Sequence, residues 1–289
     1  MIDAHHHLWD LQAVHYPWLM AKGVARFFGD PAPIQRDYPI DEFRAEAGTK
    51  GITGSVHIQV GAEDGLAEAT WVQSVAKTTP DWPMAQVVFC DLTAPGLNER
   101  LDAFQALSTV RGVRQIVGRA PEEDAVTGTN DLLDNPAFLE GLKEAGRRGL
   151  SFDLQLIPEL MEKTAAVIAQ CPEIKVALCH AGSPHDRTES GLKAWSENLK
   201  HLSALENVTC KLSGLGMFEH DWTAASLQPI VDEVIAQFGA GRVMYGSNFP
   251  VDKLYSDYDT LFSAYQKMVP AALHAEVFGA TARRFYELG

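Results

Sequence analysis

Cysteine is scarce in this chain of 289 residues, and its four cysteines lie far apart. They form no CxxC pair, which argues against a disulfide framework or a cysteine-based metal site. Three of them lie in apolar runs typical of strands, so we interpret them as reduced core residues and expect a cytoplasmic protein. The cysteines are Cys90, Cys171, Cys179 and Cys210.

Basic residues are also in short supply. Lys and Arg total 24 against 38 acidic residues, which gives a formal net charge of -14. Such a chain repels polyphosphate backbones and anionic membrane surfaces, so we expect neither nucleic acid nor membrane as a partner. A small anionic substrate stays possible, because a few arginines in a pocket outweigh distant carboxylates that salt screens over about 10 Å.

The chain contains no stretch of 18 or more apolar residues, which is the length that a membrane-spanning helix needs. The first residues lack the basic and apolar regions of a secretory signal, so we expect a protein that is neither membrane-spanning nor exported. The sequence shows no internal repeat, low-complexity tract or linker. We therefore expect one domain over residues 1–289.

Short β-rich runs alternate with longer amphipathic segments along nearly the whole chain. Eight such runs suggest strands, and the segments between them carry apolar residues at spacings of three and four, as helices do. The eight runs cover residues 2–7, 54–60, 84–92, 110–117, 151–156, 175–182, 207–214 and 242–250. The five clearest helical segments cover residues 66–80, 135–149, 158–172, 192–206 and 224–239.

Strands that are apolar over most of their length and alternate with helices predict a parallel sheet covered on its outer face. In a chain of this size the α/β architecture that fits is a closed (β/α)8 TIM barrel, with a doubly wound open sheet as the alternative. The irregular segment 10–40 is too long for a plain turn, so we interpret it as a loop insertion after the first strand. We expect the polar stretch 121–135 to form a second loop over the same end.

Polar residues end every predicted strand, and a barrel places its active site at that end. The amides and cations among them are candidate substrate contacts. In chain order the strand ends supply His5 and His7, Gln59, Asp91, Arg114 with Arg119, Gln155, His180, Lys211 with Ser213, and Asn248.

The histidine run 5–7 has a geometric interpretation. Side chains alternate along a strand, so His5 and His7 share one face while His6 points to the other. Two imidazoles on one face can hold a metal ion or polarise a substrate oxygen. A remnant of an expression tag is the alternative, but tags carry about six histidines outside the native start, whereas here the apolar pattern continues on both sides.

Further candidates lie on later strands. His180 ends an apolar strand and adds a third histidine to the same end of the barrel. Arg114 and Arg119 could bind a substrate carboxylate, because a guanidinium matches a carboxylate in two-point geometry. Ion pairs with helix carboxylates are the alternative for both arginines.

Several motifs, in this order and spacing, resemble the lactonase-type branch of the amidohydrolase superfamily, which includes the 2-pyrone-4,6-dicarboxylate lactonases and the L-fucono- and L-rhamnonolactonases. The likeness extends from residue 2 to the closing ATARRFYEL. The motifs are IDAHHH, RGVR, FDL, CHAG, KLSGL and MYGSNFPV, with YPWL and RDYPIDEF also in register.

The resemblance implies a (β/α)8 barrel whose site holds His5, His7 and His180, with an aspartate ending the last strand as the base that deprotonates water. It also implies that Arg114 and Arg119 contact a substrate carboxylate and that Tyr16 reaches the substrate. Some members carry a divalent ion and others work without one. The cofactor therefore stays open between one metal ion, zinc or manganese, on the three histidines and no metal.

Asn248 departs from the pattern of these lactonases, which commonly have Asp at this position. An amide cannot accept a proton at neutral pH and is a poor ligand for a transition metal. The base would then be Asp252, His180 or a water held by Asn248.

The leading hypothesis is a hydrolase that opens the lactone of a sugar acid or a carboxylated small molecule. A lactone isomerase or a metal-assisted decarboxylase on the same barrel is the alternative, and a barrel that only binds a ligand is a third. The oligomeric state is not determined by the sequence.

Overall fold

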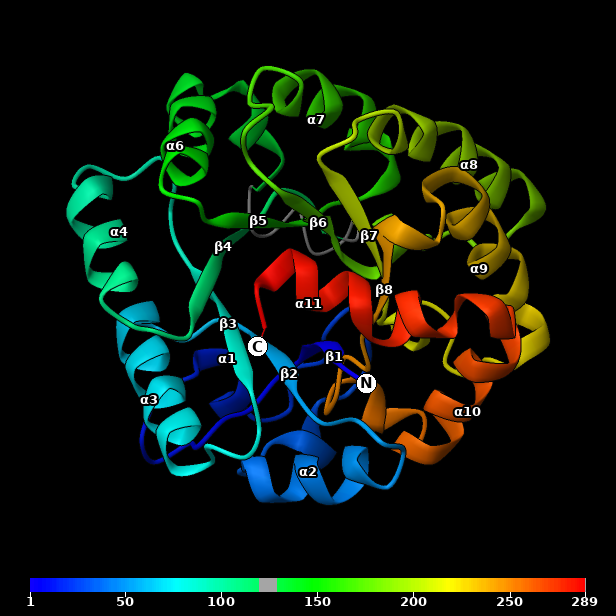
Figure 1. The fold of residues 1–289 in the computed structure, drawn as a ribbon, viewed down its shortest axis with the longest axis horizontal. Helices are drawn as coiled ribbons and strands as arrows, with labels where there is room; N and C mark the ends of the chain where they lie inside the picture. Colours follow the sequence, from blue (N-terminus) through cyan, green and yellow to red (C-terminus); the bar gives the residue numbers. More distant parts are fainter. Residues whose placement is uncertain (120–128, 289) are drawn as a thin grey trace.

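The computed structural model describes residues 1–119 and 129–288, and its eight strands are all parallel. They follow one another around the sheet in chain order, which confirms the predicted barrel, because a doubly wound sheet would reverse its strand order. Figure 1 looks along the barrel. The strands are β1 (Asp3–His6), β2 (Ser55–Ile58), β3 (Met84–Phe89), β4 (Val110–Ile116), β5 (Ser151–Gln155), β6 (Val176–Leu178), β7 (Val208–Leu212) and β8 (Val243–Tyr245).

The barrel is brought close to closure by two backbone hydrogen bonds between β1 and the segment after β8. The His7 N–H donates to the Phe249 carbonyl and the Asn248 N–H donates to the His5 carbonyl, each at 2.7 Å. These bonds fix Asn248 beside the histidine run, although the two are far apart in the sequence.

Helices cover the outer face of the sheet, and five of them, α3, α6, α7, α8 and α9, correspond to the five predicted helical segments (Figure 1). None of the helices in the described ranges is long and apolar enough to cross a membrane. The helices are α1 (Pro17–Met20), α2 (Ile40–Gly48), α3 (Gly65–Thr78), α4 (Leu97–Gln105), α6 (Pro136–Arg147), α7 (Met161–Ile168), α8 (Glu189–Ser203), α9 (Ala224–Phe238), α10 (Tyr258–Met268) and α11 (Thr281–Tyr286).

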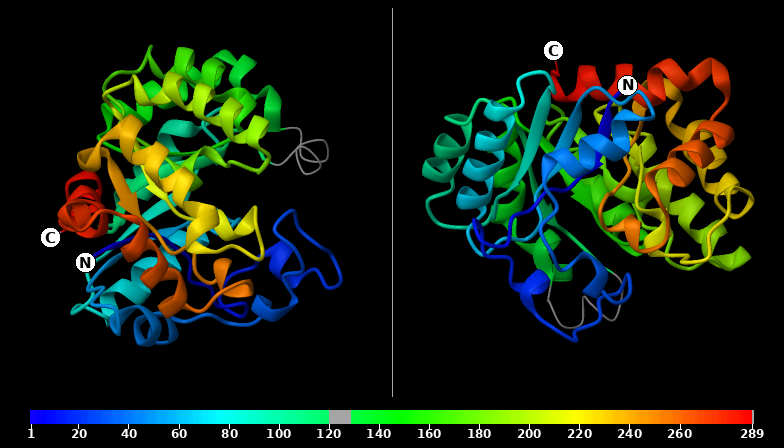
Figure 2. Two further views of the ribbon diagram at one scale, coloured as in Figure 1. Left: turned by 90° about the vertical axis from the view of Figure 1, so that its right-hand side faces the viewer. Right: turned by 90° about the horizontal axis from the view of Figure 1, so that it is seen from below.

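The two ends of the barrel are covered differently. The last helix, α11, packs Ala282, Phe285 and Tyr286 against the apolar side chains inside β1, β2, β3, β6 and β8, which closes one end. Both views of Figure 2 place α11 at this end and the dark-blue insertion between β1 and β2 at the other. The active-site end is therefore the end that the insertion covers.

A bulge in β1 decides where the histidines point. Asp3 pairs with Ser55 and His6 pairs with His57, so three residues of β1 advance against two of β2. The His6 ring lies outside the barrel, stacked on Phe43 of α2 with ring centroids 4.0 Å apart. The rings of His5 and His7 lie together, 5.1 Å apart, which confirms that His6 faces away from them.

We expect His57, a buried residue of β2, to make the stability of the fold depend on pH. Burial lowers its pKa from 6.5 to about 4. An unfolded chain therefore binds this proton at a higher pH than the folded chain does, and the contribution of His57 to stability, complete above 6.5, is lost as the pH falls toward 4. Between pH 6.5 and 4, the free energy of unfolding should therefore fall less steeply in His57→Gln than in the unchanged protein, by about 1.4 kcal/mol per pH unit. Urea unfolding at several pH values measures this difference.

The matched control for His57→Gln is His220→Gln, because His220 is exposed. The control should keep the pH dependence of the unchanged protein. Equal pH dependence in all three proteins would contradict the assignment.

Candidate active site

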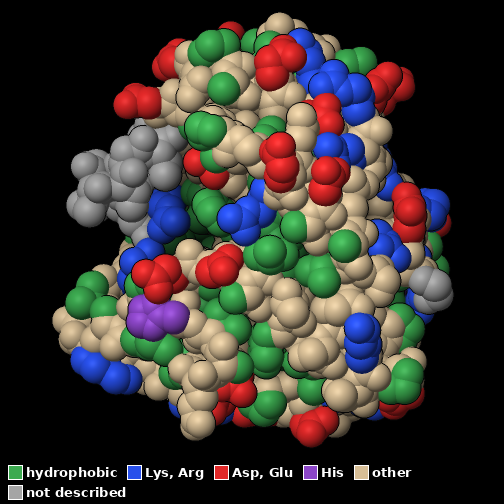
Figure 3. Space-filling view, turned by 90° about the vertical axis from the view of Figure 1, so that its left-hand side faces the viewer, with side chains coloured by type: hydrophobic (Ala, Val, Ile, Leu, Met, Phe, Trp, Pro, Cys, Tyr) green, Lys and Arg blue, Asp and Glu red, His purple; other side chains and the backbone are tan. Residues whose placement is uncertain are grey.

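A pocket of about 350 Å³ opens at the ends of the strands, and the insertion supplies one of its walls. Figure 3 shows the surface from the side of α3 and α4, with a hollow bordered by Lys or Arg and by Asp or Glu side chains. Of the described residues, no Asp or Glu lines the pocket, while three arginines do, in a chain of net charge -14. The pocket therefore favours an anionic ligand. It is lined by His7, Trp9, Pro17, Trp18, Arg26, Phe27, Phe28, Gln59, Val60, Gly61, Arg114, Ile116, Arg119, Gln155, His180, Met217, Asn248 and Val251.

The three predicted histidines meet at the floor of this pocket. The His5 ring centroid lies 4.6 Å from that of His180 and 5.1 Å from that of His7. Burial lowers the pKa of each, and the Arg114 guanidinium lowers the pKa of His7 and His180 further. All three imidazoles are therefore neutral near pH 7. His7 and His180 line the pocket, whereas His5 lies fully buried beneath it.

The predicted strands include His180 and Asn248, but the observed strands β6 and β8 end before these residues. Both residues lie in the tight turns that follow. Both have left-handed backbone conformations, with φ of 55° at His180 and 59° at Asn248. This conformation is sparsely populated by residues other than glycine, although asparagine and histidine are enriched there. The turns direct both side chains back over the barrel end.

Gly214 leaves the space that the His180 ring occupies. A Cβ at this position would lie 2.3 Å from the His180 Nδ1, and the φ of 63° also disfavours a side chain. His180 Nδ1 is held there by a 3.0 Å hydrogen bond with Ser213. The β7 end thus sets the orientation of the β6 histidine.

Gly214→Ala is expected to lower the free energy of unfolding by about 2 kcal/mol or more, because the Cβ both strains the backbone and displaces the imidazole. Urea unfolding measures this change. Gly149→Ala is the matched control, since Gly149 has a φ of 74° and a Cβ there would meet nothing within 4 Å. Equal losses in the two variants would show that the His180 contact is unimportant.

A row of buried polar side chains leads from His7 to Asp252 through Asn248. His7 Nε2 lies 3.2 Å from Asn248 Oδ1, and Asn248 Nδ2 lies 2.5 Å from Asp252 Oδ2. The Gly216 N–H donates to the other Asp252 oxygen at 3.2 Å. Asp252 does not line the pocket and is fully buried, so it acts on the pocket only through Asn248.

The partners of His7 define its protonation. Its Nδ1 lies 2.8 Å from the Ile58 carbonyl, which can only accept, so Nδ1 carries the proton and Nε2 carries a lone pair. Burial raises the pKa of Asp252 to about 7. When Asp252 is ionised, it holds the Asn248 amide with Oδ1 toward His7, which is the orientation that accepts from a protonated Nε2. The row therefore favours protonation of His7 at Nε2.

Arg114 places a buried cation beside the histidines. One of its terminal nitrogens donates to Gln155 Oε1 and the other donates to the Gln59 carbonyl at 3.3 Å. Its Nε has no partner in the described part of the chain. Neither bond is to a carboxylate, which leaves the guanidinium able to bind an anionic ligand, with Gln59 and Gln155 beside it. Contact between Arg114 and a substrate carboxylate stays a prediction.

The insertion contributes residues that the sequence did not single out. Trp18, Phe27 and Phe28 form an apolar wall, and the Arg26 guanidinium lies 5.8 Å from the Trp18 ring centroid. Arg119 lines the pocket as predicted. The only signal in the sequence was the aromatic content of segment 10–40, which does not define which of its residues face inward.

Two predicted substrate contacts lie elsewhere. Tyr16 is fully buried and absent from the pocket lining, and burial together with the nearby Glu68 raises its pKa. Lys211 is also fully buried, paired with Asp153 beneath the site. Strand alternation places a side chain inside the barrel but not at a particular depth, which is why Lys211 was expected in the pocket. The predicted loop 121–135 lies largely outside the described residues.

The three histidine rings are not arranged around one common ion position. Among residues 1–119 and 129–288, no group of three or more His, Cys, Asp or Glu side chains is arranged to hold an ion. His7 and His180 each hold one ring nitrogen on a neighbour, the Ile58 carbonyl and the Ser213 hydroxyl, which is also how a metal-binding histidine is oriented. Both ring nitrogens of the buried His5 have no partner in the described part of the chain. The residue facing the histidines from β8 is an amide, a poor ligand for transition metals.

Comparisons with known proteins cover the whole chain. A family profile described as Amidohydrolase matches residues 2–288. The protein named y4mH of Sinorhizobium fredii is 36% identical over 100% of this chain and 98% of the relative. An L-fucono-1,5-lactonase of Burkholderia multivorans is 30% identical over 99% of this chain and 96% of the relative. A Burkholderia multivorans amidohydrolase crystallised with bound zinc is 26% identical, with a TM-score of 0.84 over 100% of this chain and 99% of the other.

Proposed function

Because the chain belongs to the amidohydrolase family, we propose that it is a lactonase that opens a cyclic ester bearing a carboxylate, using its own side chains. The observation that carries the proposal is the His7–Asn248–Asp252 row, which ends in a pocket with Arg114 at its floor. The two relatives named as L-fucono-1,5-lactonases support hydrolysis of a lactone. The arginines of the pocket favour a carboxylated ring over a neutral one.

Substrate binding comes first. The carboxylate of the lactone binds Arg114, with the Gln155 amide beside it, in the two-point geometry that a guanidinium offers. The ring lies against the apolar wall formed by Trp18, Phe27 and Phe28. This places the ester carbonyl near His7 and His180.

His7 then acts as the general base. A water attacks the carbonyl carbon, and its proton passes to the lone pair of His7 Nε2. Asn248 Oδ1, 3.2 Å from Nε2, stabilises the imidazolium that forms, and the Asp252 carboxylate polarises the amide from behind. This arrangement explains how Asn248 can stand where the lactonase pattern implies an aspartate, because Asn248 passes on the influence of Asp252 without taking the proton itself.

His180 stabilises the oxyanion that forms on the carbonyl. When the Ser213 hydroxyl donates to Nδ1, the proton of His180 lies on Nε2, which can donate to the oxyanion. The carbon–oxygen bond of the ring then breaks, and His7 returns its proton to the leaving ring oxygen. The products are a hydroxyl group and a carboxylic acid, which ionises and releases one proton, and one water is consumed.

Substrate binding also prepares the base. Burial and the Arg114 cation lower the pKa of His7 to about 3, which keeps Nε2 unprotonated but makes it a weak base. A bound carboxylate offsets the charge of Arg114 and so raises the proton affinity of His7. The base therefore gains strength when a carboxylated substrate is present.

A panel of lactones tests the proposal. Carboxylated lactones, neutral aldonolactones and pyrone carboxylates are added to the folded protein in a weakly buffered pH indicator, which reports acid release. We expect turnover of at least one carboxylated lactone and slower turnover of its methyl ester. Turnover of none of the panel above background would contradict the proposal.

A further inference from the structure

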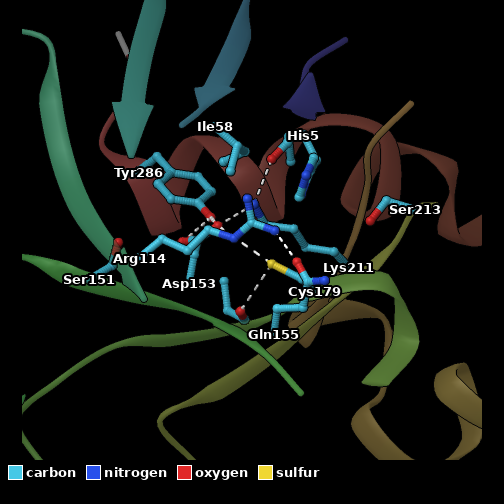
Figure 4. A network of polar contacts seen from close by, with 12 residues as sticks. His5, Ile58, Arg114, Ser151, Asp153, Gln155, Cys179, Lys211, Ser213 and Tyr286 are labelled. Carbon is cyan, nitrogen blue, oxygen red and sulfur yellow. Dashed lines mark hydrogen bonds and ion pairs between the residues drawn. The ribbon is translucent and has the colours of Figure 1, made fainter. Parts of the chain in front are cut away.

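A buried ionic layer lies directly beneath the candidate site. Lys211 Nζ donates to Asp153 Oδ2 at 2.6 Å and to the Ala4 carbonyl at 2.8 Å. The Tyr286 hydroxyl lies 2.8 Å and 2.9 Å from the two Asp153 oxygens. Figure 4 shows these contacts below His5, with Arg114 and Gln155 beside them. The layer joins β1, β5 and β7 to the C-terminal helix α11.

Contact with substrate does not explain this layer. Lys211 and Asp153 both have side chains that are 0% exposed, and neither lines the pocket. Stability does not explain it either, because burying two charges removes their hydration, and apolar residues of similar volume often stabilise a protein equally well or better. The best-attested use of such a pair is to fix the register of the elements it joins.

The layer contacts the residues that directly precede two of the three histidines. Lys211 holds the carbonyl of Ala4, the residue before His5. Cys179, the residue before His180, has its sulfur 4.0 Å from Asp153 Oδ2.

Each of the two charged residues also lies two positions before a residue of the site. Lys211 precedes Ser213 by two residues, and Ser213 bonds His180. Asp153 precedes Gln155 by two, and Gln155 bonds Arg114. Residues two apart on a strand face the same side.

We propose that Lys211, Asp153 and Tyr286 are positioning residues that fix how deep His180 and Arg114, with His5 beneath them, lie in the barrel, and that the reaction depends on these positions of His180 and Arg114. The kinetic test of this inference rests on the proposed lactonase function, whereas the spectroscopic test described below does not. The C-terminal helix thereby takes part in the active site from the opposite end of the barrel, through Tyr286.

Replacing the whole layer by apolar residues separates positioning from stability. The triple variant Asp153→Leu, Lys211→Met, Tyr286→Phe removes both charges and the hydroxyl together. We expect its urea midpoint to equal or exceed that of the unchanged protein, with kcat lower by roughly ten- to a hundredfold and KM within about threefold, as for displaced catalytic groups. A folded triple variant with unchanged kcat would overturn the inference.

Tyr286→Phe alone keeps the test decisive if the triple variant fails to fold. It removes one hydroxyl–carboxylate bond, and we expect kcat to fall roughly three- to tenfold. Tyr38→Phe is the matched control, because it removes a 2.6 Å bond from Tyr38 to Glu46, away from the site. Equal kcat values for Tyr286→Phe and the unchanged protein would count against the inference.

A spectroscopic measurement is independent of turnover. In protein labelled with nitrogen-15 at histidine, the ring signals of His5 and His180 should shift or broaden in Tyr286→Phe, while those of the exposed His220 stay in place. If the signals move but no lactone is hydrolysed by the unchanged protein, the positioning role stands and the proposed function falls. If lactones are hydrolysed and the signals do not move, the proposed function stands and the positioning role falls.

Discussion

His7→Gln is expected to lower kcat for lactone hydrolysis by a factor on the order of a thousand, the contribution of a well-placed general base. Glutamine can still accept from and donate to neighbouring groups, but it cannot take a proton from water near neutral pH. Binding of a carboxylated lactone depends on Arg114, so KM should change little. Steady-state kinetics with the best substrate of the panel measure both quantities.

The control for this variant is His6→Gln, the same change at the next residue. His6 lies outside the barrel against Phe43, so kcat should stay within a few-fold of that of the unchanged protein. A His7→Gln enzyme with nearly full kcat would exclude His7 as the base. Asp252 and His180 would then become the leading candidates again.

Arg114→Gln is expected to reduce kcat/KM for a carboxylated lactone by roughly a hundredfold. Loss of a charge-assisted hydrogen bond from a buried site accounts for about 1.5–3 kcal/mol, and the bound carboxylate also loses the cation that compensates its charge. The methyl ester of the same lactone should lose far less, because it offers no anion. The ratio of the two kcat/KM values is therefore the quantity to measure.

Arg111→Gln provides the matched control on the same strand. Arg111 donates to the Ser108 and Val110 carbonyls at the other end of β4 and does not line the pocket. This variant should keep the preference for the carboxylated ring. An equal loss for acid and ester in Arg114→Gln would mean that Arg114 supports the site without recognising the substrate.

The architecture was predictable because its signals are local. Apolar strands alternating with amphipathic helices specify a parallel sheet covered by helices, and each predicted strand contains the observed one. The choice of a closed barrel over an open sheet rested on the number of strands and the length of the chain. The predicted strands were too long at their carboxyl ends, where His180 and Asn248 adopt left-handed turns. These turns carry the site residues and break the strand pattern, so sequence periodicity could not separate them from the strands.

The site was predictable only in part. The pairing of His5 with His7 follows from strand alternation, although the β1 bulge that aligns them leaves no mark in the sequence. The link from Asn248 to Asp252 depends on a turn geometry that spacing alone does not fix. Depth inside the barrel was equally hidden, which is why Lys211 was expected to touch the substrate and instead lies beneath the site.

The central claim is that water opens the ring, and isotope incorporation tests it most directly. A carboxylated lactone is converted in water enriched in oxygen-18 under single-turnover conditions, and the product is analysed by mass spectrometry. We expect one heavy oxygen in the new carboxylate of the product. An unlabelled product would contradict hydrolysis and indicate isomerisation by internal transfer instead.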